Sequence, residues 1–353
     1  MPVSALIAQL DRASDCGSGG RRFDSSWAQI MKIIIFAVLI ILPVMSLSAQ
    51  SVDSSYYAGQ NDQLKTLPDF KDTPEMIDTK LKEVDRINEY RARLNRNPVK
   101  LDLLASRVAN MQCYNAAVND YIGHWDMNGY KPYIRYSLAG GKDHVAENAS
   151  GVTETGYDIA RMDDPVKTLE YMKTCLNGFI AEGPGGGHYE NIMDSFHNYV
   201  GIGYFCTNIG GNNQIRYNEE FIDRYIEWDD FPLTSDAQNS LSISGKVIEN
   251  DTGVFSAVVY YEKFPGKLTP SEINSKGSYP DFTSDVYRQF WPWQIGFDKG
   301  SQRFDITLKF TRPGFYYVQI LLKKGISDIP YNKPASASTE GLKNASGVVI
   351  LVK

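Results

Sequence analysis

Residues 183–193 read GPGGGHYENIM, a glycine run that is followed directly by a histidine and then by apolar residues that we expect to begin a strand. Three other polar segments precede this stretch and complete a candidate site: GHWD at 123–126, AEN at 146–148 and FIAE at 179–182. The site then contains two imidazoles and two carboxylates: His124, Glu147, Glu182 and His188. Because these residues lie far apart in the chain, only a folded domain can bring them together.

The composition is typical of an ordinary folded protein. The 353 residues are 22% charged, 42% hydrophobic and 12% aromatic, and this length allows about two domains. The formal net charge is -6, and no Lys/Arg run creates a local basic surface. We therefore expect no binding to nucleic acid.

The N-terminal region has the pattern of a secretion signal preceded by an extension. Residues 31–49 contain an apolar run and end in small residues that suit signal peptidase. The run is short for a hydrocarbon core about 30 Å thick, so we expect a cleaved signal peptide and a secreted chain that begins near Gln50, with no stable membrane span. The alternative is that this segment is not cleaved and anchors the chain in a membrane as a tilted span. We expect residues 1–30 to be a misassigned extension upstream of a true start at Met31.

Outside that extension the chain has three cysteines: Cys113, Cys175 and Cys206. For an exported chain this number predicts one disulfide and one free thiol. Either Cys175 or Cys206 can pair with Cys113, and the sequence does not choose between them. No C-x-x-C motif is present, which argues against a cysteine metal knuckle and against a redox dithiol.

Helical periodicity dominates the first half of the chain. After a polar lead at 50–72, a domain is predicted at 73–228. Its predicted helices begin at good capping residues and cover 73–94, a segment from Asp102, and 164–182. β-branched and aromatic residues predict two strands, at 199–207 and from Gln214. Helices around a small antiparallel sheet indicate an α/β domain of the α-β-α sandwich type.

The hydrophobic period changes from 3.6 to 2 across residues 229–240, which we interpret as a linker. Five strands are predicted beyond it: 241–247, 254–261, 304–310, 315–322 and 348–352. Because this region has no helix signal, we expect 241–353 to form an all-β, immunoglobulin-like sandwich whose aromatic residues pack in its core rather than bind glycans. A chain that ends near Trp228 should then fold by itself.

The motifs, taken in order, resemble one known family. The run INEYRARLNRNPVKLDLLASRVANMQC at 87–113 is followed by GHWD, AEN, NGFIAEGPGGGHYENIM at 177–193 and VGIGYF at 200–205. This series is similar to the CAP superfamily, also called SCP/TAPS or the cysteine-rich secretory protein, antigen 5 and pathogenesis-related 1 family. The resemblance covers about residues 73–228.

The family has a cavity tetrad in the order His, Glu, Glu, His. Position by position, the resemblance assigns these roles to His124, Glu147, Glu182 and His188. In the family the second Glu usually follows a tryptophan by three positions, and Phe179 stands at that place here. Glu170 is therefore an alternative to Glu182 as the second Glu of the tetrad. The GPGGG insert is also longer than the common Ser-Pro-Gly-His form of the family.

Two interpretations of the tetrad are open. Imidazole and carboxylate are ligands of first-row metals, so His124 and His188 are candidate ligands of a divalent cation such as zinc. In an enzymatic version, Glu147 or Glu182 would serve as the general base. In the alternative interpretation the four side chains form a hydrogen-bonded cavity that only fixes the loops, because each buried carboxylate needs a partner.

Other catalytic patterns are not supported. No Lys-Ser/Thr follows the glycine run, so it is not a phosphate loop, and no G-x-S-x-G occurs. The two remaining histidines, His144 and His197, are expected to be surface or capping residues.

The family resemblance implies a secreted module that binds sterols, lipids, membranes or proteins. We expect a non-enzymatic protein that binds a lipid, another small molecule, or a cell-surface or protein partner. The alternative from a different class is a metal-dependent peptidase or other hydrolase that uses the same cavity.

Overall fold

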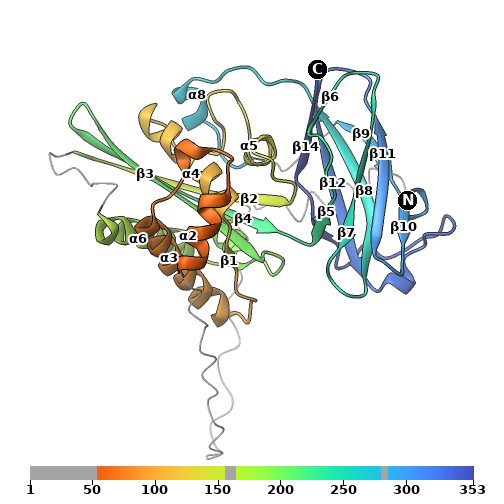
Figure 1. Cartoon of the computed structure of the whole chain (residues 1–353). Coiled ribbons are helices and arrows are strands. Elements are labelled where there is room, and N and C mark those ends of the chain that lie inside the picture. The colour runs from red at the N-terminus through yellow and green to blue at the C-terminus, as the bar shows by residue number, and fades with distance from the viewer. Residues whose placement is uncertain (1–53, 156–163, 280–284) are drawn as a thin grey trace, which may run out of the picture.

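The computed structural model describes residues 54–155, 164–279 and 285–353. The predicted extension at 1–30 and the predicted signal peptide at 31–49 lie outside these ranges. Within the ranges, no helix is both long and apolar enough to cross a membrane. The chain forms an N-terminal half that combines helices with a sheet and a C-terminal half built mainly of strands (Figure 1).

A four-stranded sheet in the order β1-β3-β4-β2 is the centre of the N-terminal half. Its strands are β1 (Lys100–Leu101), β2 (His144–Thr155), β3 (Tyr199–Ile209) and β4 (Asn212–Asp223). β4 pairs antiparallel with both β2 and β3, whereas β1 runs parallel to β3. β2 is therefore a long edge strand, and the sequence patterns did not predict it.

Six α-helices surround this sheet in the described part of the half: α2 (Ser54–Gln63), α3 (Pro74–Arg93), α4 (Leu103–Val118), α5 (Pro132–Leu138), α6 (Pro165–Ala181) and α7 (Gly187–Met193). The side chains of Thr73, Asp102 and Asp164 accept hydrogen bonds from the first turns of α3, α4 and α6. The cap positions expected from the sequence are thus those that begin the helices.

The two faces of the sheet are covered by different helices. On one face α4 approaches β3 so closely that a Cβ at Gly203 would lie 2.4 Å from the backbone of Ala109. On the other face α3 and α6 pack on β3 and β4, for example through Ile87, Leu176 and Ile202. Figure 1 shows the sheet between these two groups of helices.

Two segments differ from the expectations. Residues 183–193 do not begin a strand: their second part forms α7, whose Ile192 and Met193 are buried in the core beside α6. The polar lead contains α2, which is held by the burial of Tyr57 in the same core. Both segments are short helices that a buried apolar contact stabilises, although their own periodicity is weak.

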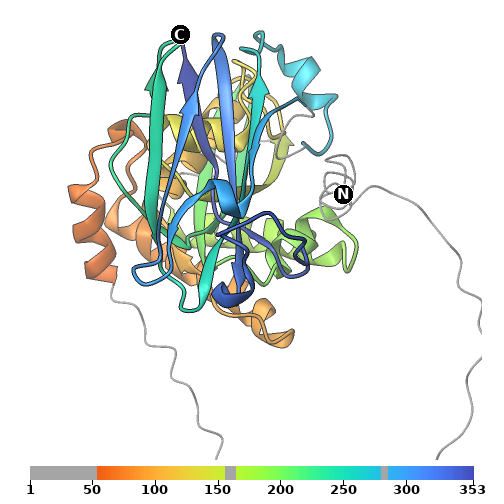
Figure 2. The same ribbon diagram turned by 90° about the vertical axis from the view of Figure 1, so that its right-hand side faces the viewer.

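Two sheets build the C-terminal half. One has the order β10-β11-β7-β5, from β5 (Ile226–Trp228), β7 (Ser240–Val247), β10 (Gly296–Asp298) and β11 (Arg303–Lys309). The other has the order β6-β14-β12-β8-β9, from β6 (Thr234–Ser235), β8 (Thr252–Glu262), β9 (Val286–Phe290), β12 (Gly314–Lys324) and β14 (Val348–Val352), with β13 (Lys343–Asn344) on β12. Residues of both sheets pack together in one hydrophobic core, for example Ile306 of β11 and Val318 of β12. Figure 2 shows these strands in front of the helical half.

The C-terminal half also contains an α-helix, although no helix signal was found there in the sequence. This helix, α8 (Pro270–Asn274), lies between β8 and β9 and begins with a capping box of Thr269 and Glu272. Short 3₁₀ turns occur at η1 (Pro68–Phe70), η2 (Pro292–Gln294) and η3 (Ile326–Asp328).

The two halves share a buried apolar cluster. The ring of Tyr133 in α5 lies 4.8 Å from the ring of Tyr317 in β12, and both side chains are almost fully buried. The backbone N–H of Val349 donates to the Ser137 hydroxyl at 2.8 Å. In addition, β5 precedes the predicted linker but pairs with β7 of the C-terminal half. A chain that ended near Trp228 would therefore expose a surface that is covered in the full protein.

Candidate functional site

Glu147 and His124 form the first half of the tetrad. Glu147 lies in β2 on the face covered by α4 and α5, and its side chain is fully buried. His124 Nδ1 lies 2.8 Å from Glu147 Oε1. The other oxygen, Oε2, accepts hydrogen bonds from Arg135 at 2.5 Å and from Asn218 at 2.9 Å. Burial alone would raise the pKa of Glu147, but the charge of Arg135 and the hydrogen bond to His124 outweigh it and lower the pKa.

Arg135 is the residue that organises this half of the site, and the sequence patterns did not identify it. It lies in α5 and is buried. Besides Glu147, its guanidinium donates to the backbone carbonyls of His124 at 2.6 Å and Tyr130 at 2.9 Å. The same side chain thus fixes the loop that carries His124 and neutralises the carboxylate that His124 contacts.

A second buried carboxyl, Glu220, lies directly opposite Glu147 on β4. Its Oε1 is 3.8 Å from Arg135 Nη2. Burial and the nearby charge of Glu147 raise the pKa of Glu220 well above its ordinary value. The two pKa shifts have opposite directions, so Glu147 is the more acidic carboxyl of the pair.

Glu182 and His188 form the second half of the tetrad. His188 Nδ1 lies 2.6 Å from Glu182 Oε1, and the backbone N–H of His188 donates to Glu182 Oε2 at 3.1 Å. The glycines between them make this approach possible, because Gly183 and Gly185 have positive φ and a Cβ at Gly186 would lie 2.4 Å from Glu182 Cβ. The longer insert therefore does not prevent Glu182 from reaching His188.

Phe179 occupies the position where the family usually has a tryptophan, and it supports this pair. Its ring stacks on the His188 ring with a centroid distance of 4.4 Å. Glu170, the competitor of Glu182, is exposed elsewhere on α6. The glutamate that contacts His188 is thus Glu182.

The structure shows two separate His–Glu pairs. In each pair a carboxylate orients Nδ1 of an imidazole, as happens behind many metal-bound histidines. However, no three His, Cys, Asp or Glu side chains in the described part of the chain are grouped as a metal ion requires. The residue types fit a divalent cation such as zinc, but this arrangement does not.

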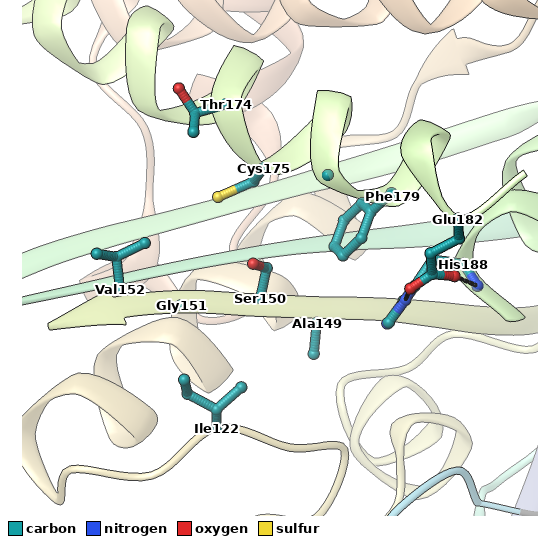
Figure 3. A pocket seen from close by; sticks show the side chains of 11 residues that line it. Ile122, Ala149, Ser150, Gly151, Val152, Thr174, Cys175, Phe179, Glu182 and His188 are labelled. Atoms are coloured by element: carbon teal, nitrogen blue, oxygen red, sulfur yellow. Dashed lines mark hydrogen bonds and ion pairs between the residues drawn. The ribbon is translucent and has the colours of Figure 1, made fainter. Parts of the chain in front are cut away.

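A groove of about 370 Å³ opens beside the second pair. It follows β2 and is bounded by α6 and by Ile122 (Figure 3). Glu182 and His188 lie at one end, with Phe179 next to them. The groove is lined by β2 residues Ala149, Ser150, Gly151 and Val152, by α6 residues Thr174, Cys175, Gly178 and Phe179, and by Ile122, Glu182 and His188. His124 and Glu147 do not line it, so a ligand in the groove would meet only half of the tetrad.

His144 and His197 are not surface residues, contrary to the sequence-based expectation. Both are buried, and both place Nδ1 on the carboxylate of Asp223, at 2.9 and 2.6 Å. Although burial alone raises the pKa of Asp223, the two imidazoles outweigh it and lower the pKa strongly. His197 Nε2 also contacts Asn191 Oδ1 at 2.9 Å, and these two histidines therefore belong to the internal framework.

The three cysteines of the described chain are free thiols, so the predicted disulfide is wrong. Cys113 lies in α4 on one face of the sheet, where its Sγ is 3.5 Å from Asn218 Oδ1. Cys175 and Cys206 belong to the core on the opposite face. The sheet itself thus separates Cys113 from both expected partners. Burial raises the pKa of Cys175 and of Cys206 to about 11, which keeps these thiols protonated.

Comparisons with known proteins agree with the resemblance of the motifs. Residues 84–216 match the family model described as CAP, the cysteine-rich secretory protein family. No curated protein matches the chain.

Among solved structures, the chain is similar to an outer surface protein from Borrelia burgdorferi, with 17% identity, a TM-score of 0.29, and coverage of 42% of this chain and 93% of that one. It is also similar to an extracellular protein containing a SCP domain from Bacillus anthracis, with 19% identity, a TM-score of 0.28, and coverage of 40% and 39%. A third similar structure is BmVAL-1, with 13% identity, a TM-score of 0.30, and coverage of 43% and 79%. The chain therefore spans well under half of the Bacillus protein.

Proposed function

Since the chain contains a domain of the CAP, or cysteine-rich secretory protein, family, we propose that it is a secreted binding protein whose groove beside Glu182 and His188 takes a small apolar or amphipathic ligand. The observation that carries the proposal is the groove itself. Its volume of about 370 Å³ lies in the range of small-molecule sites. Its walls combine apolar side chains with a few polar groups, of which Glu182 and His188 lie at one end (Figure 3).

The geometry gives less support to the metal-dependent hydrolase. Such an enzyme would need both imidazoles at one ion and a glutamate free to accept a proton. The two imidazoles lie in separate pairs, and Glu147 is engaged by Arg135, Asn218 and His124. An unbiased substrate screen with and without a chelator tests this alternative: chelator-sensitive turnover that is lost in His188→Ala would favour the hydrolase.

Gly178 provides a direct test of the groove. It lies within α6 and lines the groove, and an added Cβ would meet no atom within 4 Å. Gly178→Trp should therefore fill the groove without a clash at its first carbon, and it also removes a helix-weakening glycine. Gly59→Trp is the matched control, because Gly59 lies in α2 and is equally open.

Binding would be measured with a fluorescent fatty acid and a fluorescent sterol. We expect at least one probe to bind the wild type and Gly59→Trp, and Gly178→Trp to lose that binding. If neither probe binds the wild type, or if Gly178→Trp binds as well as Gly59→Trp, the groove is not the ligand site.

Zinc is a narrower proposal for the same tetrad. Its binding would require the two His–Glu pairs to approach each other, after which zinc should raise the melting temperature by mass action. His188→Ala should abolish that increase, and Glu147→Gln should weaken it. Equal zinc-induced shifts in the wild type and His188→Ala, or no shift between about pH 6 and 8, would leave the pairs as a structural network.

Secretion and the second domain complete the proposal. The predicted signal peptide at 31–49 would be removed, so N-terminal sequencing of the exported protein should find a start near Gln50. An intact chain that begins before Met31 would contradict this. For the C-terminal half, a common core between two sheets supports an immunoglobulin-like sandwich.

A further inference from the structure

One segment of the C-terminal half leaves its own sheets and lies on the N-terminal half. It comprises residues 263–279, which follow β8 and include α8. In Figure 1, α8 lies above the helical half near α4, away from the strands that precede and follow it. The segment contacts the loop that carries His124, while the ring of Phe264 at its start meets that of Phe315 in β12.

These contacts are specific and partly buried. Ile273 of α8 is fully buried against Tyr121 and Ala116. The backbone N–H of Leu268 donates to the carbonyl of Met127 at 3.0 Å, and the N–H of Ile122 donates to Asn274 Oδ1 at 2.9 Å. Apolar packing and hydrogen bonds to the backbone of Ile122 and Met127 thus hold the segment on both sides of His124.

The end of the segment reaches the tetrad. The hydroxyl of Tyr279 accepts a hydrogen bond from the backbone N–H of Glu147 at 3.0 Å, and its ring lies 4.8 Å from the His124 ring. The ring of Trp125 meets that of Tyr279 edge-on at 6.3 Å. Tyr279 therefore covers the imidazole and also takes the outward-facing N–H of the edge strand.

The two halves of the tetrad differ in exposure accordingly. The side chain of His124 is 14% exposed and that of Glu147 is fully buried, whereas those of His188 and Glu182 are 31% and 36% exposed. The groove reaches only the second pair. The tetrad is thus closed on the side where the segment lies and open on the other side.

We propose that residues 263–279 are a built-in cap that occupies the His124–Glu147 half of the cavity, so that a ligand requiring all four tetrad side chains can bind only after the cap is released. The inference rests on the proposed function to the extent that the covered residues belong to the cavity assigned to ligand binding. The occupant of the first half is the protein's own Tyr279.

The accessibility of each histidine to diethyl pyrocarbonate tests the cap without any ligand. The rate of carbethoxylation of His124 would be followed by mass spectrometry, with His188 in the same molecule as the reference. In the full-length wild type we expect His124 to react more slowly than His188. In Tyr279→Ala the His124 rate should rise roughly tenfold, the change in opening equilibrium expected from the loss of one ring contact and one hydrogen bond.

Two further variants keep the test decisive. Tyr279→Phe retains the ring and loses only the hydroxyl, so it should give a smaller increase at His124. Tyr56→Ala is the control, because Tyr56 is an exposed tyrosine of α2. An unchanged His188 rate shows that a variant is folded.

Amide hydrogen exchange provides an independent measurement. If the cap opens as one unit, Tyr279→Ala should accelerate exchange at Ile122 as well as at Glu147, because Asn274 and Tyr279 protect these two amides. The proposal is overturned if His124 reacts as fast as His188 in the wild type, or if Tyr279→Ala leaves the His124 rate unchanged. Because neither result depends on ligand binding, failure of the cap can be distinguished from failure of the groove.

Discussion

Replacing Glu219 by glutamine should make the protein less sensitive to alkaline pH. Glu219 lies in β4 and is fully buried on the face covered by α3 and α6. Its oxygens accept hydrogen bonds from the Tyr217 hydroxyl and from Asn148 Nδ2, each at 2.8 Å. Burial raises the pKa of Glu219 from 4.5 to about 8, so the group is neutral in the folded protein at neutral pH. A glutamine amide imitates this neutral form.

The direction of the pH effect follows from proton binding. With its raised pKa, the folded Glu219 carboxyl binds more protons than the unfolded one between pH 4.5 and about 8, so the free energy of unfolding falls as pH rises through this window. A single group with these two pKa values loses about 2 kcal/mol between about pH 6 and pH 8. Glu83, whose pKa burial raises to about 7, adds a smaller loss of the same sign.

The hydrogen bonds around residue 219 can be retained in Glu219→Gln. The glutamine oxygen can accept from Asn148, while its amide donates to the Tyr217 oxygen. The Tyr217 proton can then turn towards Glu83, whose Oε1 has no hydrogen-bond partner in the described part of the chain. The substitution should therefore change the pH dependence more than the stability at pH 6.

Urea denaturation at several pH values between about 5 and 9 is the assay. The free energy of unfolding of the wild type should fall with pH, and the fall should be smaller by about 2 kcal/mol over pH 6 to 8 in Glu219→Gln. Glu170→Gln, at an exposed position of α6, is the matched control and should keep the wild-type pH dependence. Equal pH dependence in Glu219→Gln and the wild type would show that Glu219 is not a neutral buried acid.

Three further substitutions test the framework. Gly203→Ala should destabilise the protein by about 1 to 3 kcal/mol in urea denaturation, since its Cβ would meet the Ala109 backbone at 2.4 Å; an unchanged midpoint would contradict the close packing. Asp223→Asn should lower the free energy of unfolding by about 3 kcal/mol at pH 7. Because the folded pKa of Asp223 is lowered below 3.8, the stability that its carboxylate contributes is lost as pH falls. The difference in unfolding free energy between Asp223→Asn and the wild type should therefore shrink in acid. Tyr317→Ala, by removing the ring that packs on Tyr133, should cost about 3 to 5 kcal/mol and lower the melting of both halves together; separate transitions would show that the halves fold independently.

Much of the N-terminal half could be predicted because its helices begin with strong local signals. Thr73, Asp102 and Asp164 each cap the expected helix, and β3 and β4 have β-branched and aromatic patterns. The short helices α2 and α7 were missed because tertiary packing, rather than their own periodicity, stabilises them. The helix α8 was missed although its start has a local signal, the capping box of Thr269 and Glu272. The β-rich character of the C-terminal half followed from the change of hydrophobic period.

The sequence predicted which residues belong to the candidate site, but not how these residues are arranged. Each histidine has a glutamate partner, yet local sequence contains nothing that places Arg135 between Glu147 and Glu220, or Tyr279 on His124. The contacts of Arg135 depend on how α5, β2 and β4 pack within the N-terminal half, and the contact of Tyr279 depends on how the C-terminal half packs on it. The predicted disulfide was wrong for the same reason, because the number of cysteines does not say on which face of a sheet each thiol lies.

The separation of the two His–Glu pairs has a structural cause in β4. Tyr217, Asn218, Glu219 and Glu220 follow one another in this strand, and all are buried because both faces of the sheet are covered. Successive side chains point to opposite faces, so each face receives its own carboxyl. Glu220 joins Glu147 and Arg135 on one face, and Glu219 joins Tyr217 and Asn148 on the other.

Each half of the tetrad is attached to a different one of these networks. His124 is held by Glu147 on the α4 and α5 face, while the backbone carbonyl of His188 accepts from Asn148 on the α6 face at 3.2 Å. The imidazoles can therefore approach each other only around the free edge of β2, where Tyr279 already bonds to Glu147. Release of the cap would therefore expose the His124–Glu147 half of the site without a rearrangement of either buried network.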